Sequence, residues 1–136
     1  MVEILDSNLK EKLISEARQA RELAYADYSG NFKVGAAALT EEGEIFTGCN
    51  IENASFGATI CAERVAVFKA VASGHRRIRA VAVIADTPDP ISPCGICRQV
   101  IAEFGAEAEI LMANTAGDTR VAGMQDLLPA AFQFRR

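Results

Sequence analysis

The stretch Ile60-Cys61-Ala62-Glu63-Arg64 brings a thiol, a carboxyl group and a guanidinium together directly before an apolar helical pattern. A second stretch, Pro93-Cys94-Gly95-Ile96-Cys97, adds two cysteines with the C-x-x-C spacing. Each stretch alone is ambiguous, because a cysteine beside an acid is usually a core residue and a C-x-x-C pair can be a redox dithiol. Taken together, the two stretches contain enough thiols for a metal centre.

Cys61, Cys94 and Cys97 are the candidate ligands of a zinc ion. The fourth cysteine, Cys49, forms no second C-x-x-C pair, so a closed four-cysteine structural site is possible but irregular. Three ligands with an open fourth position fit the spacing better. That arrangement is typical of catalytic zinc.

Both cysteine stretches are expected at helix N-termini. The Ser92-Pro93 pair favours a helix start at Cys94, and Thr59 is a candidate cap before Cys61. The free N–H groups and the dipole at a helix N-terminus favour thiolates. Glu63 has the wrong spacing from Thr59 for a capping box, so its carboxyl group is not needed there. We therefore expect two helix N-termini to meet at one cation, with Glu63 beside it.

The net charge of such a site indicates that a positively charged side chain should lie near the thiolates. Three thiolates on Zn²⁺ leave a net negative charge, which weakens the ability of the metal to acidify a bound water. Arg64 and Arg98 each lie next to the cysteine stretches. We expect at least one of them to turn inwards and donate hydrogen bonds to the thiolates.

The composition predicts one globular domain covering residues 1–136, with 50% hydrophobic and 24% charged residues. A net charge of −4 disfavours nonspecific binding to nucleic acid, which needs a basic face. The apolar runs are shorter than the roughly 20 residues that cross a bilayer, and residues 1–6 lack the basic-then-apolar order of a signal peptide. These features predict a cytoplasmic protein without a membrane partner, in which cysteines are ligands or core residues rather than disulfides.

Periodicity and turn residues predict alternating helices and strands, with a first helix capped by Ser7 and a polar binding loop at residues 50–59. This order predicts an α/β fold in which helices cover both faces of a sheet. The expected helices span residues 7–25, 60–72 and 94–104, and a short final helix is expected to begin at residues 126–128. The expected strands span residues 32–40, 45–49, 78–85, 109–113 and 120–122.

Four motifs give the chain a family resemblance. They are Phe32-Lys33-Val34-Gly35-Ala36-Ala37, Gly48-Cys49-Asn50-Ile51-Glu52-Asn53-Ala54, Cys61-Ala62-Glu63-Arg64 and Ser92-Pro93-Cys94-Gly95-Ile96-Cys97-Arg98-Gln99-Val100. In this order they resemble the small homotetrameric, zinc-dependent cytidine deaminases of pyrimidine salvage, with similarity from the first helix to residues 127–132. The resemblance implies a three-layer α-β-α sandwich with a mixed five-stranded sheet.

The resemblance also implies a reaction. Cys61, Cys94 and Cys97 would hold Zn²⁺, and a water would complete the tetrahedron. Glu63 would shuttle protons while cytidine or 2′-deoxycytidine is hydrolysed to uridine or 2′-deoxyuridine and ammonia. Arg64 is similar to an arginine that neutralises the ligand thiolates.

The substrate-binding residues follow from the same resemblance. Asn50 and Glu52 would hold the ribose hydroxyl groups, and Ile51 would line the pocket. Phe32 is similar to an aromatic residue that packs near the base. Phe132 is similar to a residue that a neighbouring subunit contributes to the pocket, which implies a homotetramer.

Four other residues carry separate expectations. Asp27 replaces a proline that is common in relatives, which should alter loop stiffness but not chemistry. Phe56 replaces a frequent tyrosine, which puts any hydroxyl contact there in doubt. Cys49 is expected to be a core thiol, and His75, the only histidine, is expected to be solvated.

Two other functions remain open. The chain could be a zinc deaminase of another aminated nucleoside or a nucleoside antibiotic. It could also be a noncatalytic zinc-binding module, although a structural site would have no use for Glu63 beside the metal.

Overall fold

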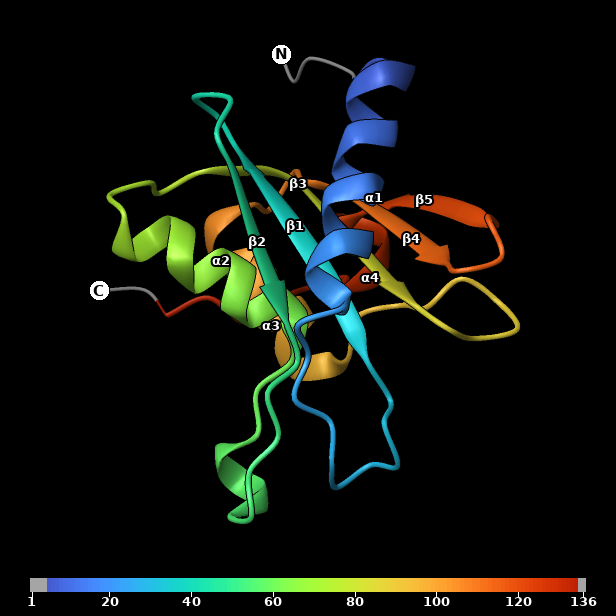
Figure 1. Cartoon of the computed structure of the whole chain (residues 1–136). Coiled ribbons are helices and arrows are strands. Elements are labelled where there is room, and N and C mark those ends of the chain that lie inside the picture. The colour runs from blue at the N-terminus through green and yellow to red at the C-terminus, as the bar shows by residue number, and fades with distance from the viewer. Residues whose placement is uncertain (1–4, 135–136) are drawn as a thin grey trace.

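The computed structural model describes residues 5–134, which form a mixed five-stranded sheet between two helical layers (Figure 1). The strand order is β2-β1-β3-β4-β5. β3 and β4 are parallel, and the other neighbouring strands are antiparallel. The strands are β1 (Val34–Thr40), β2 (Ile45–Cys49), β3 (Ile78–Ala85), β4 (Glu109–Asn114) and β5 (Thr119–Gly123). Residues 1–4 and 135–136 of the predicted domain lie outside the described part.

The helices lie on opposite faces of this sheet, as the element order predicted. They are α1 (Ser7–Arg21), α2 (Ala62–Ala72), α3 (Gly95–Phe104) and α4 (Met124–Leu127), with a short 3₁₀ helix, η1 (Phe56–Ala58). Leu13 and Ala17 of α1 pack against one face of the sheet, whereas Val67 of α2 and Ile101 of α3 pack against the other. The three-layer α-β-α sandwich is therefore confirmed.

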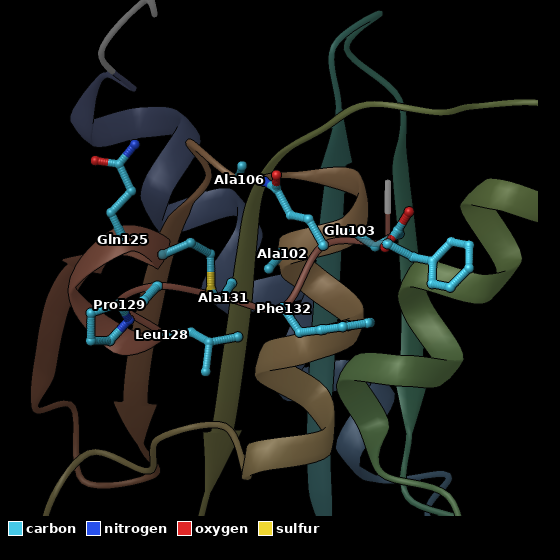
Figure 2. Close-up of a pocket in the computed structure, with 12 residues that line it drawn as sticks. Ala102, Glu103, Ala106, Gln125, Leu128, Pro129, Ala131 and Phe132 are labelled. Atoms are coloured by element: carbon cyan, nitrogen blue, oxygen red, sulfur yellow. The ribbon is translucent and has the colours of Figure 1, made fainter. Parts of the chain in front are cut away.

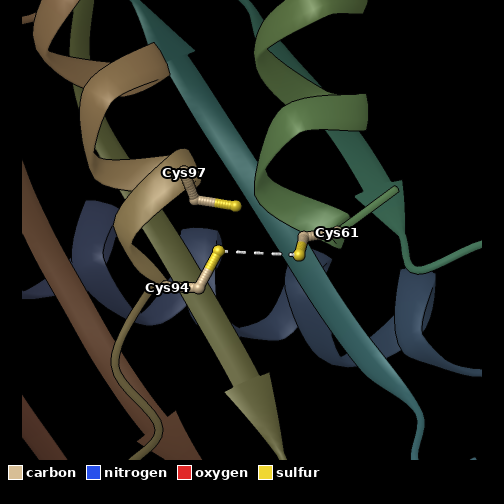
Figure 3. A group of neighbouring side chains, drawn as sticks. All are labelled: Cys61, Cys94 and Cys97. Atoms are coloured by element: carbon tan, nitrogen blue, oxygen red, sulfur yellow. Dashed lines mark hydrogen bonds between the residues drawn. The ribbon is translucent and has the colours of Figure 1, made fainter. Parts of the chain in front are cut away.

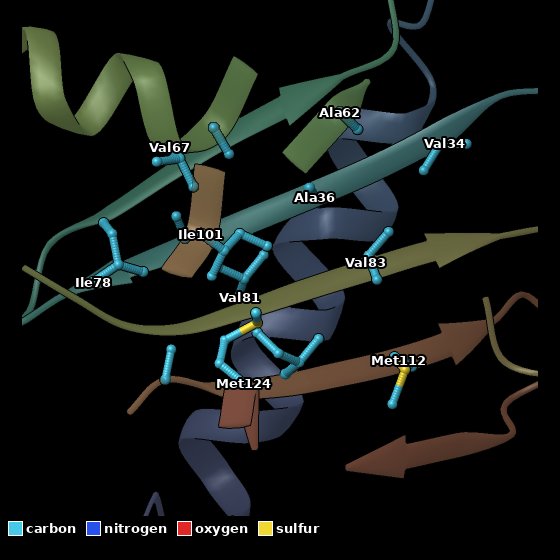
Figure 4. Packing of buried hydrophobic residues seen from close by; sticks show 14 of the residues in the cluster. Val34, Ala36, Ala62, Val67, Ile78, Val81, Val83, Ile101, Met112 and Met124 are labelled. Atoms are coloured by element: carbon cyan, nitrogen blue, oxygen red, sulfur yellow. The ribbon is translucent and has the colours of Figure 1, made fainter. Parts of the chain in front are cut away.

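Successive side chains along the central strands point to opposite faces of the sheet, and this alternation divides the buried residues into two cores. Val81 and Val83 point to the layer of α2 and α3 (Figure 4), and Ala82 and Ile84 point to the layer of α1. The predicted burial of residues 78–85 on both faces is confirmed. Small residues in β1, all of them buried, let helices approach the sheet closely from both sides.

The limits of the first and last helices differ from the prediction. Asp6, rather than Ser7, caps α1, because its carboxyl group accepts a hydrogen bond from the Leu9 N–H at 2.8 Å. The helix ends at Arg21 instead of continuing to Tyr25. The N–H of Tyr25 donates a hydrogen bond to the Asn50 carbonyl at 3.0 Å. At the other end of the chain, α4 spans Met124–Leu127, so it ends where the final helix was expected to begin.

Two loops project together from one end of the sheet (Figure 1). One connects α1 to β1, and the other, residues 50–61, connects β2 to α2. Ile51 bridges Tyr25 on one side and Ile60 on the other, so the two loops share backbone hydrogen bonds. Ile51 and Ile60 exchange two such bonds, each of 3.0 Å, directly before Cys61. Within residues 5–134 no helix combines the length and the apolar character needed to span a bilayer.

Candidate metal centre and active site

The Sγ atoms of Cys61, Cys94 and Cys97 lie within 4.8 Å of one another (Figure 3). Cys61 is the N-cap residue of α2, Cys94 is the N-cap residue of α3, and Cys97 lies in the first turn of α3. The expected meeting of two helix N-termini is therefore confirmed. The predicted caps are wrong, because the cysteines themselves take the N-cap positions. Thr59 instead accepts a hydrogen bond from the Asn53 N–H.

The three sulfur atoms fit a tetrahedral metal ion. Thiolates at about 2.3 Å from a tetrahedral zinc lie roughly 3.8 Å apart, and the Cys61 and Cys94 sulfur atoms are 3.8 Å apart. Cys49 is not a member of this cluster, which is the only such group among the described residues. The cluster is therefore able to hold a metal ion with three thiolates. This arrangement leaves a fourth tetrahedral position to a nonprotein ligand.

Hydrogen bonds within the cluster favour deprotonation of one of the three thiols. A hydrogen bond from Cys97, together with one from Arg64, lowers the pKa of the Cys61 thiol well below its ordinary value. The same hydrogen bond to Cys61, with burial, raises the pKa of the Cys97 thiol. One thiolate thus forms easily at neutral pH, and a bound cation would favour loss of the remaining protons.

Arg64 is the arginine that turns inwards. Its Nη2 atom donates to the Cys61 sulfur at 3.4 Å. Its Nε atom is the one buried side-chain nitrogen or oxygen without a hydrogen-bond partner in the part of the chain that the structure describes. Arg98 points elsewhere and donates to the carbonyl oxygens of Pro93 and Leu127.

Glu63 is a buried carboxyl group in the first turn of α2, with 4% of its surface exposed. The pKa of Glu63 is raised to about 7, mainly by burial and also by the negative charge of Cys61, while a backbone hydrogen bond and the charge of Arg64 act in the opposite direction. A carboxyl group with a pKa near neutrality can both accept and donate a proton at physiological pH. Such a group beside the three-cysteine cluster is suited to acid–base chemistry.

Asn50 and Glu52 hold the projecting loops in place. The Asn50 amide donates to the Phe32 carbonyl and accepts from the Val34 N–H, both at 2.8 Å. Glu52 Oε1 accepts hydrogen bonds from the backbone N–H groups of residues 28–29, at 2.8 and 2.9 Å. The sequence did not predict these bonds, because no local pattern connects residues so far apart in the chain.

Hydrogen bonding also sets the charge of Glu52. The Ser29 side chain and the backbone N–H groups lower the pKa of the Glu52 carboxyl group, with burial acting in the opposite direction. Glu52 is therefore a carboxylate at neutral pH. Its second oxygen, Oε2, takes no part in the two backbone bonds.

The remaining predicted binding residues are partly or mostly exposed. Phe32 and Ile51, with 43% and 44% of their surface exposed, belong to the two projecting loops. Phe132 lies elsewhere and lines a cavity of about 590 Å³ between α3, α4 and the C-terminal segment (Figure 2). Its carbonyl accepts a hydrogen bond from Gln99. The three cysteines of the cluster do not line that cavity.

Two expectations outside the site differ from the structure. His75 is not simply solvated, because its ring nitrogens contact the carboxyl groups of Glu42 and Glu44 in the β1–β2 hairpin. Its ring also packs against Phe46. Cys49 is only partly buried and is absent from both core clusters, so it is not the core thiol that was expected, although burial still raises the pKa of its thiol.

Comparisons with known proteins agree with this geometry. Residues 7–113 match the family model described as the cytidine and deoxycytidylate deaminase zinc-binding region. The cytidine deaminase of Sporosarcina psychrophila is 54% identical over 123 residues, which is 90% of each chain. That of Halalkalibacterium halodurans is 51% identical over 124 residues, covering 90% of this chain and 93% of the relative. A crystal structure of cytidine deaminase from Burkholderia pseudomallei superposes with a TM-score of 0.86 at 53% identity, covering 90% of this chain and 98% of the other.

Proposed function

Since this chain belongs to the cytidine and deoxycytidylate deaminase family, we propose that it hydrolyses cytidine and 2′-deoxycytidine to uridine and 2′-deoxyuridine with release of ammonia. We propose that residues 1–136 act as a single catalytic domain. The observation that carries the proposal is the position of the buried Glu63 carboxyl group beside a three-cysteine cluster. A purely structural metal site does not need such a carboxyl group.

Each residue of the cluster has a proposed task. Cys61, Cys94 and Cys97 hold the metal, and Arg64 balances their charge through its hydrogen bond to the Cys61 sulfur. Zinc, when bound, lowers the pKa of a water molecule so that a nucleophile is available at neutral pH. Glu63 accepts a proton from the attacking water, and it delivers protons to ring N3 and to the amino group that leaves as ammonia. A pKa of about 7 supports both transfers, because the group exchanges protons readily at that pH.

The loop residues favour a free nucleoside as substrate. We propose that Asn50 and Glu52 bind ribose hydroxyl groups, with Ile51 and Phe32 lining the pocket. The Glu52 carboxylate can accept a hydrogen bond from a hydroxyl group, and it would repel a phosphate group attached at the same position. A nucleotide or a polynucleotide is therefore disfavoured.

A substrate panel tests this function directly. Zinc-loaded protein is incubated with cytidine, 2′-deoxycytidine, deoxycytidylate and adenosine, and products are separated by chromatography while ammonia is measured. We expect uridine and 2′-deoxyuridine with equal amounts of ammonia, and none from the Glu63→Gln variant beyond a residual rate. Turnover of another aminated nucleoside but not of cytidine would favour the alternative substrate class. A zinc-loaded protein inactive on all substrates would favour a noncatalytic module.

We also propose that the chain acts as a homotetramer in which Phe132 of one subunit completes the pocket of another. Phe132 is 69% exposed in the single chain and lines a cavity that the three cysteines do not line. Large apolar side chains also remain exposed on the loops at the metal end, including Tyr28 and Phe56 at 51% and 76%. Contiguous exposed apolar surface is typical of an interface. Light scattering should give a tetramer mass, and a fully active monomer would contradict the proposal.

The proposed location of the enzyme is the cytoplasm, where it would act in pyrimidine salvage. All four cysteines are free thiols in the structure. Zinc binding by thiolates requires reduced cysteines, and the cytoplasm keeps thiols reduced. Cell fractionation with an antibody against the protein tests this location, and recovery in an oxidising compartment would contradict it.

A further inference from the structure

Gly48 of β2 lies directly beneath the first turn of α2. It pairs with Ala36 of β1, whose side chain belongs to the core on the α2 side of the sheet. A Cβ atom added at Gly48 would lie 2.5 Å from the Ala62 carbonyl oxygen and 2.6 Å from the Ala66 backbone nitrogen. Real Cβ atoms essentially never come within 3.0 Å of another heavy atom, so any side chain at this position requires the helix or the strand to move.

The contact is between backbones, so no change of rotamer can relieve it. Ala62, Ala66 and Ala70 repeat every four residues along α2, and all three are fully buried. Residues at this spacing lie on one face of a helix. Small residues on that face let α2 approach the sheet closely. Gly48, which has no side chain, allows the same close approach from the strand.

This close contact is located at the metal centre. Ala62, whose carbonyl would meet the added Cβ, lies between Cys61 and Glu63. Cys61 is the N-cap of α2 (Figure 3), whereas the other two cysteines belong to α3. A movement of the first turn of α2 therefore shifts Cys61 and Glu63 together, relative to the cysteines of α3.

The size of this movement follows from the contact distance. Ordinary van der Waals contact begins at 3.4 Å, so relief of the 2.5 Å contact requires a displacement of about 0.9 Å. Metal–ligand distances tolerate only about 0.2 Å, and a misplacement of about 1 Å in an active site can lower a rate roughly 100-fold. The displacement is large on the scale of the site and small on the scale of the fold.

We propose that Gly48 is a positioning residue of the metal centre, because its lack of a side chain sets the distance from α2 to the sheet. This distance brings Cys61 and Glu63 into place against the cysteines of α3. The inference rests on the proposed function of the cluster as a zinc centre. It adds that a glycine outside the ligand set determines whether the ligands meet.

The test compares Gly48→Ala with Gly105→Ala. A Cβ at Gly105 would also lie 2.5 Å from a carbonyl oxygen, that of Ile78, but Gly105 caps the end of α3 that is distant from its cysteines. The two variants thus introduce similar steric conflicts, and only one of them acts on the first turn of α2. Zinc affinity is measured by competition with a chromophoric chelator, Co²⁺ absorption reports the number and geometry of bound thiolates, and melting temperature reports stability.

We expect both variants to lose stability, and only Gly48→Ala to lose zinc affinity, by about 10–100-fold, with altered Co²⁺ bands. A Gly48→Ala protein that is less stable but keeps the wild-type zinc affinity and Co²⁺ spectrum would overturn the inference. If Gly48→Ala does not fold, Ala66→Val pushes the same turn outwards from the helix side. A folded Ala66→Val protein with reduced zinc affinity supports the inference, and one with wild-type affinity overturns it. Wild-type protein that binds Co²⁺ without thiolates would overturn the zinc centre itself, and the inference with it.

Discussion

Replacing Glu63 with glutamine should remove most of the activity and, in the metal-free protein, increase stability. Glutamine preserves the shape of the side chain but cannot exchange protons. A positioned acid–base group typically contributes about 10²–10⁴-fold to a rate, so we expect a loss of that size. The same substitution removes a carboxyl group that is 4% exposed and must ionise in a buried position.

The gain in stability can be worked out from the pKa. Burial raises the pKa of Glu63 from 4.5 to about 7. Because each pKa unit corresponds to about 1.4 kcal/mol, the ionised form costs the folded state about 3 kcal/mol. Below pH 4.5 the group is protonated in both the folded and unfolded states, and the cost is absent. Between pH 4.5 and 7 the unfolded state ionises first, so stability falls as the pH rises, and above pH 7 the full cost applies.

Urea unfolding of the metal-free proteins measures this difference. Wild type and Glu63→Gln are unfolded at several pH values from about 5 to 8, and the free energy of unfolding is obtained by linear extrapolation. Glu11→Gln, which removes a carboxyl group from the exposed surface of α1, is the matched control. The gain for Glu63→Gln should grow with pH and approach about 3 kcal/mol at pH 8. Bound zinc should reduce it, because a nearby cation favours the carboxylate.

A gain that does not change with pH would refute this reasoning, because the effect would then come from packing rather than from ionisation. An unchanged free energy of unfolding would refute it as well. Retention of full activity by Glu63→Gln would remove Glu63 from the proton transfers altogether.

Three further substitutions test other parts of the account. Arg64→Gln should weaken zinc binding about 10–100-fold, because it removes a hydrogen bond to the Cys61 sulfur. Arg98→Gln should leave zinc affinity unchanged, because Arg98 donates to a backbone carbonyl oxygen and not to a thiolate. Equal losses of zinc affinity in the two variants would show that Arg64 does not balance the charge of the thiolates. Glu52→Ala should raise KM for cytidine about 10–100-fold, the loss expected for hydrogen bonds to a charged group, and an unchanged KM would reject its binding role. His75→Gln should lower the melting temperature most near about pH 6. Its hydrogen bond to Glu42 raises the pKa of His75 above 6.5, so this stabilisation is complete below 6.5 and is lost as the pH rises through the raised pKa; a pH-independent difference would contradict this.

The parts of the fold that depend on local pattern could be predicted from the sequence. The apolar run at residues 78–85 coincides with β3, because a strand buried on both faces needs apolar residues throughout. Cys94 and Cys97 lie close together because their spacing spans about one helical turn. The approach of Cys61 to this pair could be inferred from metal chemistry, which requires a third ligand.

The parts that depend on contacts between distant segments could not be predicted in the same way. The hydrogen bonds from Glu52 to residues 28–29 join two loops, and no periodic pattern encodes them. The end of α1 differs from the prediction for a similar reason, since the N–H of Tyr25 donates a hydrogen bond to the distant carbonyl of Asn50 and not to a carbonyl of the helix. The contact of Gly48 with α2 depends on the packing of a helix on a strand. A single glycine in the sequence does not reveal it.

The pair of hydrogen bonds between Ile51 and Ile60 has a consequence for how this enzyme family can vary. The two bonds close the base of the loop just before Cys61, so the residues between them form a ring that is fastened independently of α2. Insertions, deletions and new side chains near Phe56, at the tip of that ring, can therefore accumulate without transmitting a displacement to the metal ligand that follows. The loop tip and the metal ligand are thus mechanically separate, although only a few residues of chain connect them.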